Sequence, residues 1–199
     1  MKKTLTLIAI SLLTLATSAQ TARQVLDKAA AVVSQKGGVK ASFKMASTQY
    51  GNASGTISLK GRKFQLSVPQ AKMWFDGKTL WTYMTNNDEV NVSNPTDAQL
   101  QVLNPYQFIN MYKQGYNYTL KTAGTTHQVH LTAKDQKRRV QEMYITVNKK
   151  TCSPTQIKMK QGDKWTTFTV VSLKSAKLAD AHFRFNAKDY PKAEVIDLR

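Results

Sequence analysis

Residues 39–45 read VKASFKM, in which apolar or small side chains at the odd positions alternate with lysine or serine at the even positions. This period of two is typical of a β-strand with one face in the core and one face in water. The same alternation recurs in residues 56–60, which read TISLK, and in residues 63–68, which read KFQLSV. The stretch from 39 to 68 therefore predicts three consecutive half-buried strands.

The strand pattern continues toward the C-terminus. Asp76-Gly77 and Asn86-Asn87 are turn signals between short apolar runs. Later strand patterns lie at residues 116–120, 127–133, 140–147, 156–160 and 166–173. Because about ten or eleven strands follow one another without alternating helices, the sheet should be mainly antiparallel and should curl into a barrel or part of one.

Helical spacing occurs in two places. Thr21 is a candidate cap for a first helix with apolar residues at positions 25, 26, 29, 32 and 33, and Gly37-Gly38 ends it. Residues 96–113 predict two further short helices, the second opened by Asn104-Pro105. The predicted fold class is mainly β (α+β), with three short helices against a long curved sheet.

The first 19 residues predict a secretory signal peptide. Lys2 and Lys3 precede an apolar run at residues 5–15, and small residues follow it at 16–19. Residues 20–199 then form the expected mature protein, a length that suits a single domain. Cys152 is the only cysteine, so an internal disulfide is excluded.

The chain is strongly basic. Its formal net charge of +17 falls to +15 when Lys2 and Lys3 are removed with the signal peptide. The basic residues are spread along the chain, so one interpretation is a solvated outer face of the sheet. The other is attraction to anionic lipid headgroups or to an acidic partner protein. Nucleic acid is the least favoured partner because the chain is expected to be exported.

Motifs that would predict catalysis are missing. His127 and His130 are three apart on a predicted strand, which puts them on opposite faces, and His182 is isolated in sequence. Residues 51–55 read GNASG, which shifts the serine out of a nucleophile elbow. Asp88-Glu89 is the only adjacent acidic pair and lies in a predicted turn. We therefore expect no enzyme, no metal and no cofactor, although an active site built from distant residues stays an alternative.

Five short motifs resemble the pattern of the LolA family of lipoprotein carriers, and they follow one another along the chain in the same order as in that family. The most specific is the DGKTLW string of residues 76–81, which Tyr83 follows. The others are KASF at 40–43, Gly55, Asn104-Pro105, and FRF at 183–185 with AEV at 193–195. Together they extend over nearly the whole mature chain.

The resemblance implies a half-barrel antiparallel sheet covered by three helices, with lipid held between sheet and helices. It implies a periplasmic chaperone that takes acylated lipoproteins from an inner-membrane ABC exporter and hands them to an outer-membrane acceptor. Contact with membranes would be peripheral, and a monomer would suffice. A lipid-binding sensor or interaction module on a similar sheet is the main alternative, and an enzyme that acts on lipids is a further one.

Family members often carry Arg-Pro at the turn after the second strand, where the arginine latches the helical lid. This chain instead reads KGRK at residues 60–63. Arg62 is therefore the candidate latch, and an ordinary basic hairpin turn is the alternative.

A lipid cavity should be apolar but loosely packed, which favours methionine and movable aromatic side chains. The alternative for each position is simple packing of helix against sheet. The predicted cavity wall is Phe43, Met45, Ile57, Leu59, Phe64, Leu66, Met73, Trp81, Met143 and Met159. The predicted lid is Leu100, Leu103, Phe108 and Ile109.

Overall fold

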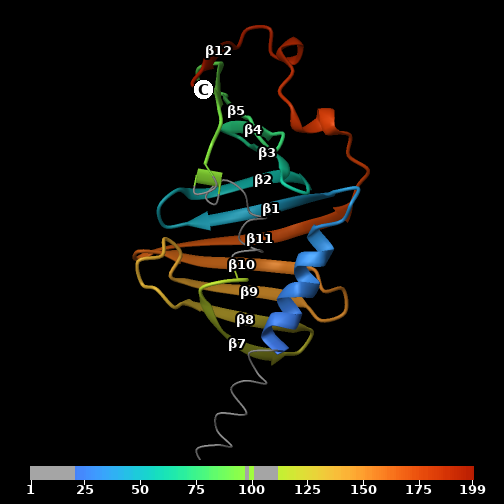
Figure 1. Ribbon diagram of the computed structural model, residues 1–199, viewed down its shortest axis with the longest axis vertical. Helices are drawn as coiled ribbons and strands as arrows, with labels where there is room; N and C mark the ends of the chain where they lie inside the picture. Colours follow the sequence, from blue (N-terminus) through green and yellow to red (C-terminus); the bar gives the residue numbers. More distant parts are fainter. Residues whose placement is uncertain (1–20, 97–98, 101–111) are drawn as a thin grey trace, which may run out of the picture.

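The computed structural model describes residues 21–96, 99–100 and 112–199, most of which belong to one long curved β-sheet (Figure 1). Twelve strands of the described residues form this sheet. They are β1 (Val39–Ser47), β2 (Gly51–Lys60), β3 (Lys63–Val68), β4 (Ala71–Phe75), β5 (Leu80–Met84), β6 (Glu89–Ser93), β7 (Tyr116–Ala123), β8 (Thr126–Ala133), β9 (Glu142–Asn148), β10 (Pro154–Gln161), β11 (Lys164–Ser175) and β12 (Glu194–Asp197). The prediction of a mainly β fold is confirmed.

The sheet consists of two meanders that meet at its centre. Its spatial order is β12-β6-β5-β4-β3-β2-β1-β11-β10-β9-β8-β7, so β1 and β11 lie side by side in the middle (Figure 1). Each hairpin joins sequence neighbours, and the β1–β11 pair joins the two meanders across most of the chain. All these pairs are antiparallel, whereas β12 pairs with β6 in parallel. The predicted antiparallel character is therefore confirmed, with one edge strand as the exception.

One turn illustrates how the local sequence fixes a hairpin. The Asp76 carboxylate accepts hydrogen bonds from the backbone N–H groups of Lys78 and Thr79, at 3.0 and 2.9 Å. Gly77 has φ 105°, a left-handed value that glycine adopts without strain. Because these residues satisfy the turn locally, β4 ends and β5 begins where the Asp-Gly signal predicts.

The pairing of β1 with β11 contains a β-bulge. Ser42 pairs with Ser172 and Phe43 pairs with Val170, so Val171 is an extra residue on β11. A bulge bends its strand and puts two successive side chains opposite one residue of the partner. Val171 is consequently 60% exposed although it is apolar.

The N-terminal helix covers residues 21–33 and ends ahead of Gly38, as predicted from its spacing. Its buried side chains are Ala22, Leu26, Ala29, Ala30 and Val33, which all belong to the main hydrophobic core. Gly38 has φ 97°, and a Cβ on it would lie 2.6 Å from the Leu59 carbonyl oxygen. Only glycine therefore allows the chain to turn from this helix into β1 at such a close approach.

The core lies on one face of the sheet, which we call the inner face. The alternation read from residues 39–45 is confirmed there, because Val39 and Phe43 are buried while Lys40 and Lys44 are exposed. The same alternation puts Ile57, Phe64 and other apolar residues of the neighbouring strands into one cluster with the helix. We call the opposite face the outer face.

The C-terminal segment, residues 176–199, covers part of the outer face. It contains the 3₁₀ helices η1 (Asp180–Phe183) and η2 (Ala187–Asp189) and returns to the far end of the sheet as β12 (Figure 1). Trp74 of β4 contacts the rings of Phe185 and Tyr190, with centroid distances of 5.6 and 5.5 Å. This second apolar layer was not predicted.

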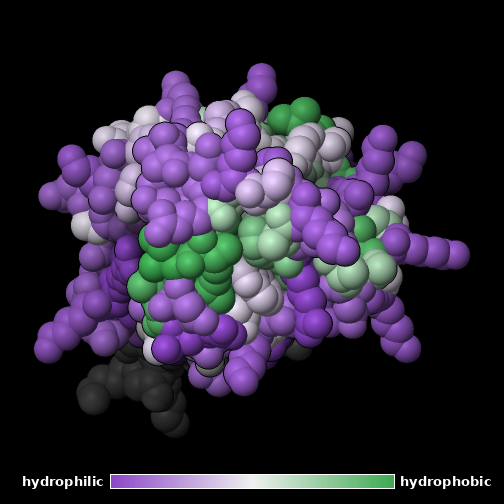
Figure 2. All heavy atoms as spheres, turned by 90° about the horizontal axis from the view of Figure 1, so that it is seen from above, coloured by the Kyte–Doolittle hydropathy of each residue, from purple (hydrophilic) through white to green (hydrophobic). Residues whose placement is uncertain are grey.

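Seen from the β12 end, the surface is mostly hydrophilic with apolar patches between projecting polar side chains (Figure 2). Val195 and Leu198, in and just after β12, are 51% and 63% exposed. The two helices predicted within residues 96–113 lie largely outside the described residues. Of that stretch, residues 99–100 are helical and Leu100 is buried in the main core.

Candidate functional site

The inner face divides into a closed part and a less covered part. In the closed part, Phe64, Met143 and Ile145 are at most 1% exposed. The less covered part consists of half-buried apolar side chains of β1, β3, β4 and β11 that pack against this core. We call it the open apolar floor, and its members are Ala41, Met45, Leu66, Val68, Met73, Phe168 and Leu173.

The open apolar floor lies mainly on β1, β3, β4 and β11. Met45 pairs with Phe168 on one side and with Ala53 on the other. Met73 pairs with Leu66 of β3. Met45 lies beside the Phe168 ring, and Met73 adds a second flexible thioether side chain on β4, so the shape of this surface can adapt to an apolar partner.

Gly55 of β2 shapes the middle of this surface. It pairs with Phe43, and a Cβ on Gly55 would lie 2.8 Å from the Phe43 ring and 2.9 Å from a Val68 methyl group. Such distances are too short for a real side chain, so glycine is required for Phe43 to lie across β2. The Phe43 ring then meets Phe168 edge to face, with centroids 6.0 Å apart.

Most of the predicted cavity wall lies on the inner face. Phe43, Ile57, Leu59, Phe64, Met143 and Met159 are buried in the core, and Met45, Leu66 and Met73 are partly exposed on the open apolar floor. The structure corrects the placement of Trp81, which was predicted for the cavity wall. Its side chain lies on the outer face, where it pairs with Trp74 and Val92. The adjacent apolar residues Leu80 and Trp81 leave the choice of face open in sequence, and Leu80 is the one that points inward.

The remaining predicted residues are placed as follows. Leu100 of the lid is buried in the main core, whereas Leu103, Phe108 and Ile109 lie outside the described residues. Arg62, the candidate latch, lies in the exposed turn between β2 and β3. Its role as a latch stays a prediction.

The predicted cavity wall did not include Val68, Phe168 or Leu173, although Val68 was assigned to the apolar face of its strand. The alternation of β3 would have indicated Val68, since it follows Phe64 and Leu66 at the same period. In β11, however, the bulge shifts the alternation at Val171, so the residues before and after it cannot be assigned to one face from sequence.

Tyr112 links the N-terminal helix to β7 through two hydrogen bonds. The Tyr112 hydroxyl donates to the Asp27 carboxylate of the helix at 2.5 Å. Tyr118 of β7 in turn donates to the Tyr112 carbonyl oxygen. Burial, followed by the hydrogen bond to Asp27, raises the pKa of Tyr112 above its usual range, so its hydroxyl stays protonated and can act as the donor.

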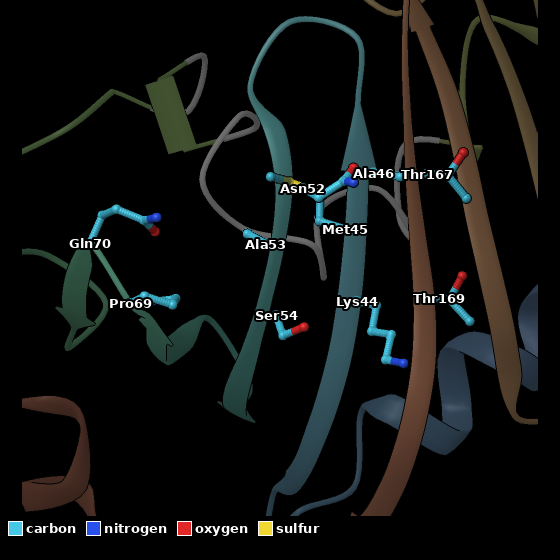
Figure 3. Close-up of a pocket in the computed structure, with 10 residues that line it drawn as sticks. All are labelled: Lys44, Met45, Ala46, Asn52, Ala53, Ser54, Pro69, Gln70, Thr167 and Thr169. Carbon is cyan, nitrogen blue, oxygen red and sulfur yellow. The ribbon is translucent and has the colours of Figure 1, made fainter.

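Two hollows border the sheet, and the second of them touches the main core at Leu80. One, of about 510 Å³, is on the outer face, where Lys44, Ser54, Thr167 and Thr169 project from β1, β2 and β11 (Figure 3). Another, of about 590 Å³, lies between Leu80 and Ser93 on one side and Arg139 on the other. Of the predicted cavity wall, Met45 alone contributes to the lining of these two hollows.

Candidate catalytic groups are dispersed. His127 pairs with Val147 on the inner face, whereas His130 stacks on Tyr144 on the outer face, so the predicted placement on opposite faces is confirmed. His130 lies 2.9 Å from the Glu142 carboxylate, which also accepts a hydrogen bond from the Tyr144 hydroxyl at 2.7 Å. Within the described ranges, no three His, Cys, Asp or Glu side chains are grouped so that they could hold a metal ion.

The long one-sided sheet and its partly covered apolar face define a class of curved-sheet binding domain. A family model described as outer membrane lipoprotein carrier protein LolA matches residues 12–163. The chain therefore belongs to the LolA family, whose fold is one for binding and carrying and is not that of a known enzyme family. The resemblance read from the sequence motifs is confirmed.

Solved structures resemble this chain at low sequence identity. An uncharacterized conserved protein from Thermus thermophilus is 13% identical, with a TM-score of 0.61 over 89% of this chain and 99% of its own. A DUF1329 family protein from Desulfovibrio piger is 11% identical, with a TM-score of 0.50 over 85% and 98%. A LolA superfamily protein from Nitrosomonas europaea is 12% identical, with a TM-score of 0.44 over 82% and 97%. A search of the curated proteins found no match.

Among the described residues, no helix has the length and apolar character that crossing a membrane would require.

Proposed function

We infer that this chain is a periplasmic carrier that moves lipoproteins from the inner membrane to the outer membrane. Its acyl-chain ligand would bind on the inner face of the sheet. The observation that carries this proposal is the open apolar floor, because the family fold leaves Met45, Met73, Phe168 and their neighbours only partly covered. Membership of the LolA family supports the same conclusion.

The physical need for such a carrier follows from the hydrophobic effect. An acyl chain gains about 0.8 kcal/mol for each CH₂ group that leaves water. An unshielded lipoprotein would therefore not cross an aqueous compartment at a useful rate. The transfer from bilayer to carrier is close to neutral, since both environments are apolar, so loading and release need partners that drive them.

These partners are, in the proposal, an inner-membrane ABC exporter for loading and an outer-membrane acceptor of higher affinity for release. Residues 20–199 would act as one domain after removal of residues 1–19. The predicted lid residues and the Arg62 latch would control access to the acyl chains. No nucleic acid and no cofactor take part.

The first test is native mass spectrometry of the mature protein purified from the periplasm without detergent. A population that carries an acylated protein is the expected result. Free lipid alone would favour a lipid-binding sensor on the same fold and would contradict the carrier role. Loading should also depend on the exporter, which depletion of the exporter checks.

A matched pair of variants tests whether the inner face holds the ligand. Met45→Glu places a charge on the open apolar floor, whereas Ala46→Glu places the same charge on the exposed outer face of the same strand. We expect Met45→Glu to lose the bound acyl chains and Ala46→Glu to retain them, because a carboxylate is costly to desolvate against lipid. Equal loading of two folded variants would show that the ligand lies elsewhere.

A further inference from the structure

The outer face of four neighbouring strands, β9, β10, β11 and β1, carries a concentration of positive charge. We call this surface the lysine strip. Lys40, Lys44, Lys158, Lys160 and Lys174 all occupy outward positions on these strands, opposite to the apolar inward ones. Glu142 is the one carboxylate at an outward position of the same four strands, and it already accepts hydrogen bonds.

Two of these lysines are held together without a counter-charge. Lys40 pairs directly with Lys174 across the β1–β11 ladder, an arrangement of like charges that destabilises a sheet. A second pair, Lys60 and Lys63, shares one counter-charge, because the oxygens of Asp180 lie 3.0 and 2.8 Å from the two Nζ atoms. In the part of the chain that the structure describes, no carboxylate forms an ion pair with Lys40 or Lys174. Lys40 and Lys174 therefore offer uncompensated charge to a partner, whereas Lys160 lies opposite Glu142 in the β10–β9 ladder.

Aromatic and apolar side chains lie among these lysines. Lys158 Nζ lies 4.4 Å from the centroid of the half-buried Trp165 ring, and Tyr144 lies between His130 and Trp165. The β-bulge adds Val171, which is 60% exposed on this face. Tryptophan and tyrosine beside lysine are the side chains that suit the boundary between lipid headgroups and acyl chains.

The outer hollow of Figure 3 adjoins the lysine strip. It shares Lys44 with the strip and adds the hydroxyl groups of Ser54, Thr167 and Thr169 (Figure 3). These hydroxyl groups and the Lys44 ammonium group are donors that a phosphate-bearing headgroup can accept, beside apolar lining residues such as Ala46 and Pro69. The C-terminal segment covers the outer face over β4, where Trp74 meets Phe185 and Tyr190, and leaves Lys44, Val171 and Lys174 exposed.

We propose that the lysine strip docks the protein on the surface of an anionic phospholipid bilayer, with Trp165 and Val171 at the headgroup level. This inference does not depend on the ligand of the inner face. The docked protein keeps its inner face directed away from the lipid surface, so docking and apolar binding use opposite sides of one sheet.

The test measures sedimentation of the mature protein with vesicles of phosphatidylglycerol and phosphatidylcholine, against vesicles of phosphatidylcholine alone. Binding should require the anionic lipid and should weaken as salt rises, because the Debye length shortens. The strip variant combines Lys40→Gln, Lys158→Gln and Lys174→Gln. Each lysine near an anionic surface strengthens binding roughly fivefold, so the loss of three lysines should weaken vesicle binding by about 100-fold.

A control variant separates the lysine strip from net charge. Lys137→Gln, Lys150→Gln and Lys192→Gln combined remove the same charge from exposed positions away from the strip. We expect this control to change binding by less than about tenfold, and neither variant should melt at a lower temperature than the parent. Equal losses in the two variants would overturn the proposal, as would equal binding to both kinds of vesicle.

Tryptophan fluorescence gives an independent readout. Vesicles containing phosphatidylglycerol should shift the emission of the parent to shorter wavelength, and Trp165→Phe should abolish the shift while Trp74 and Trp81 remain. A shift that persists in Trp165→Phe would place the contact elsewhere. Binding to polyglutamate without binding to the anionic vesicles would identify an acidic protein as the partner and overturn the bilayer proposal.

Discussion

Gly55 shows how a single residue determines the shape of the inner face. Its missing side chain is what allows Phe43 and Val68 to lie close to β2. A Cβ at this position would also meet the Ser67 carbonyl oxygen at 2.5 Å. The backbone oxygen cannot rotate away as a flexible side chain can, so β2 and β3 would have to move apart.

Gly55→Ala should therefore lower the free energy of unfolding by about 1–3 kcal/mol, the usual cost of overpacking. Urea denaturation of the purified variant measures this change. Ser54→Ala is the matched control, because Ser54 is exposed on the outer face of the same strand, and it should stay within about 0.5 kcal/mol. A Gly55→Ala variant as stable as the parent would contradict the close packing described above.

Glu142 on the outer face titrates in an unusual environment. The hydrogen bond from the Tyr144 hydroxyl, with a smaller contribution from His130, holds its pKa below the ordinary value of 4.5. A carboxyl whose folded pKa is lowered stabilises the fold above the ordinary pKa, and this stabilisation is lost as the pH falls through the folded pKa. Acid should therefore weaken this part of the sheet only below pH 4.5.

Tyr144→Phe should raise the pKa of Glu142 toward its ordinary value, since the strongest hydrogen bond to the carboxylate is removed. Carbon-13 NMR of the Glu142 carboxyl group, followed from about pH 7 to about pH 2, gives the pKa directly. Tyr50→Phe removes an exposed hydroxyl elsewhere and should leave that titration unchanged. An unaltered Glu142 pKa in Tyr144→Phe would mean that the hydrogen bond does not form in solution.

At the scale of elements, the C-terminal segment is fastened to the outer face chiefly through Tyr190. Its ring contacts Trp74, Tyr83 and Phe185, with centroid distances of 5.5, 4.7 and 5.4 Å. Lys72 Nζ lies 3.1 Å from its hydroxyl oxygen. The segment therefore depends on one side chain that touches three other rings.

Tyr190→Ala should destabilise the protein by about 1–3 kcal/mol, less than the loss for a fully buried aromatic residue because Tyr190 is half-buried. It should also move the fluorescence of Trp74 toward that of an exposed tryptophan. Lys192→Ala, at an exposed position just beyond, is the control for both measurements. If Tyr190→Ala unfolds at the same urea concentration as the parent, the segment is held by other contacts.

Sequence periodicity predicted the hairpin strands well but not β12. Most strands of the two meanders have one dry and one wet face, so their alternation is visible in the sequence. β12 lies at an edge, and its four residues Glu194–Asp197 are exposed or half-buried without alternation. Its pairing with β6 is set by the route of the C-terminal segment, which no local pattern encodes.

The same reasoning explains what could be predicted of the candidate site. Methionine and aromatic residues at inward positions were recognisable, because their strands keep a strict period of two. Trp81 escaped this rule since the C-terminal segment makes part of the outer face apolar as well. When both faces of a strand pack against apolar groups, its apolar and polar residues do not alternate. The sequence then does not show which side chains point to the inner face.

At the scale of the whole molecule, the sheet depends on a strand beyond the part matched by the family model. The match ends at residue 163, and β11 begins at Lys164. β11 pairs with both β1 and β10, so it is the connection between the two meanders. The core on the inner face is continuous only when β11 is present.

A chain that ends after Asp163 should therefore lose cooperative unfolding and should show no sharp transition in urea, monitored by circular dichroism. A chain that ends after Ser175 keeps β11 and should still unfold in a single transition, although at lower urea because the outer aromatic layer is lost. A cooperative transition in the shorter chain would show that the two meanders fold independently.

The central position of β1 has a consequence for the order in which the chain is made. Ser47 of β1 and its partner Thr166 of β11 are 119 residues apart in the sequence. Synthesis runs from the N-terminus, so β1 exists before this neighbour does. Throughout that interval one side of β1 has unpaired backbone groups that could join a strand of another chain. Lys40 and Lys44 lie on this strand, and lysine on an unpaired strand discourages such joining, so the charges of the finished outer face also disfavour aggregation of the unfinished sheet.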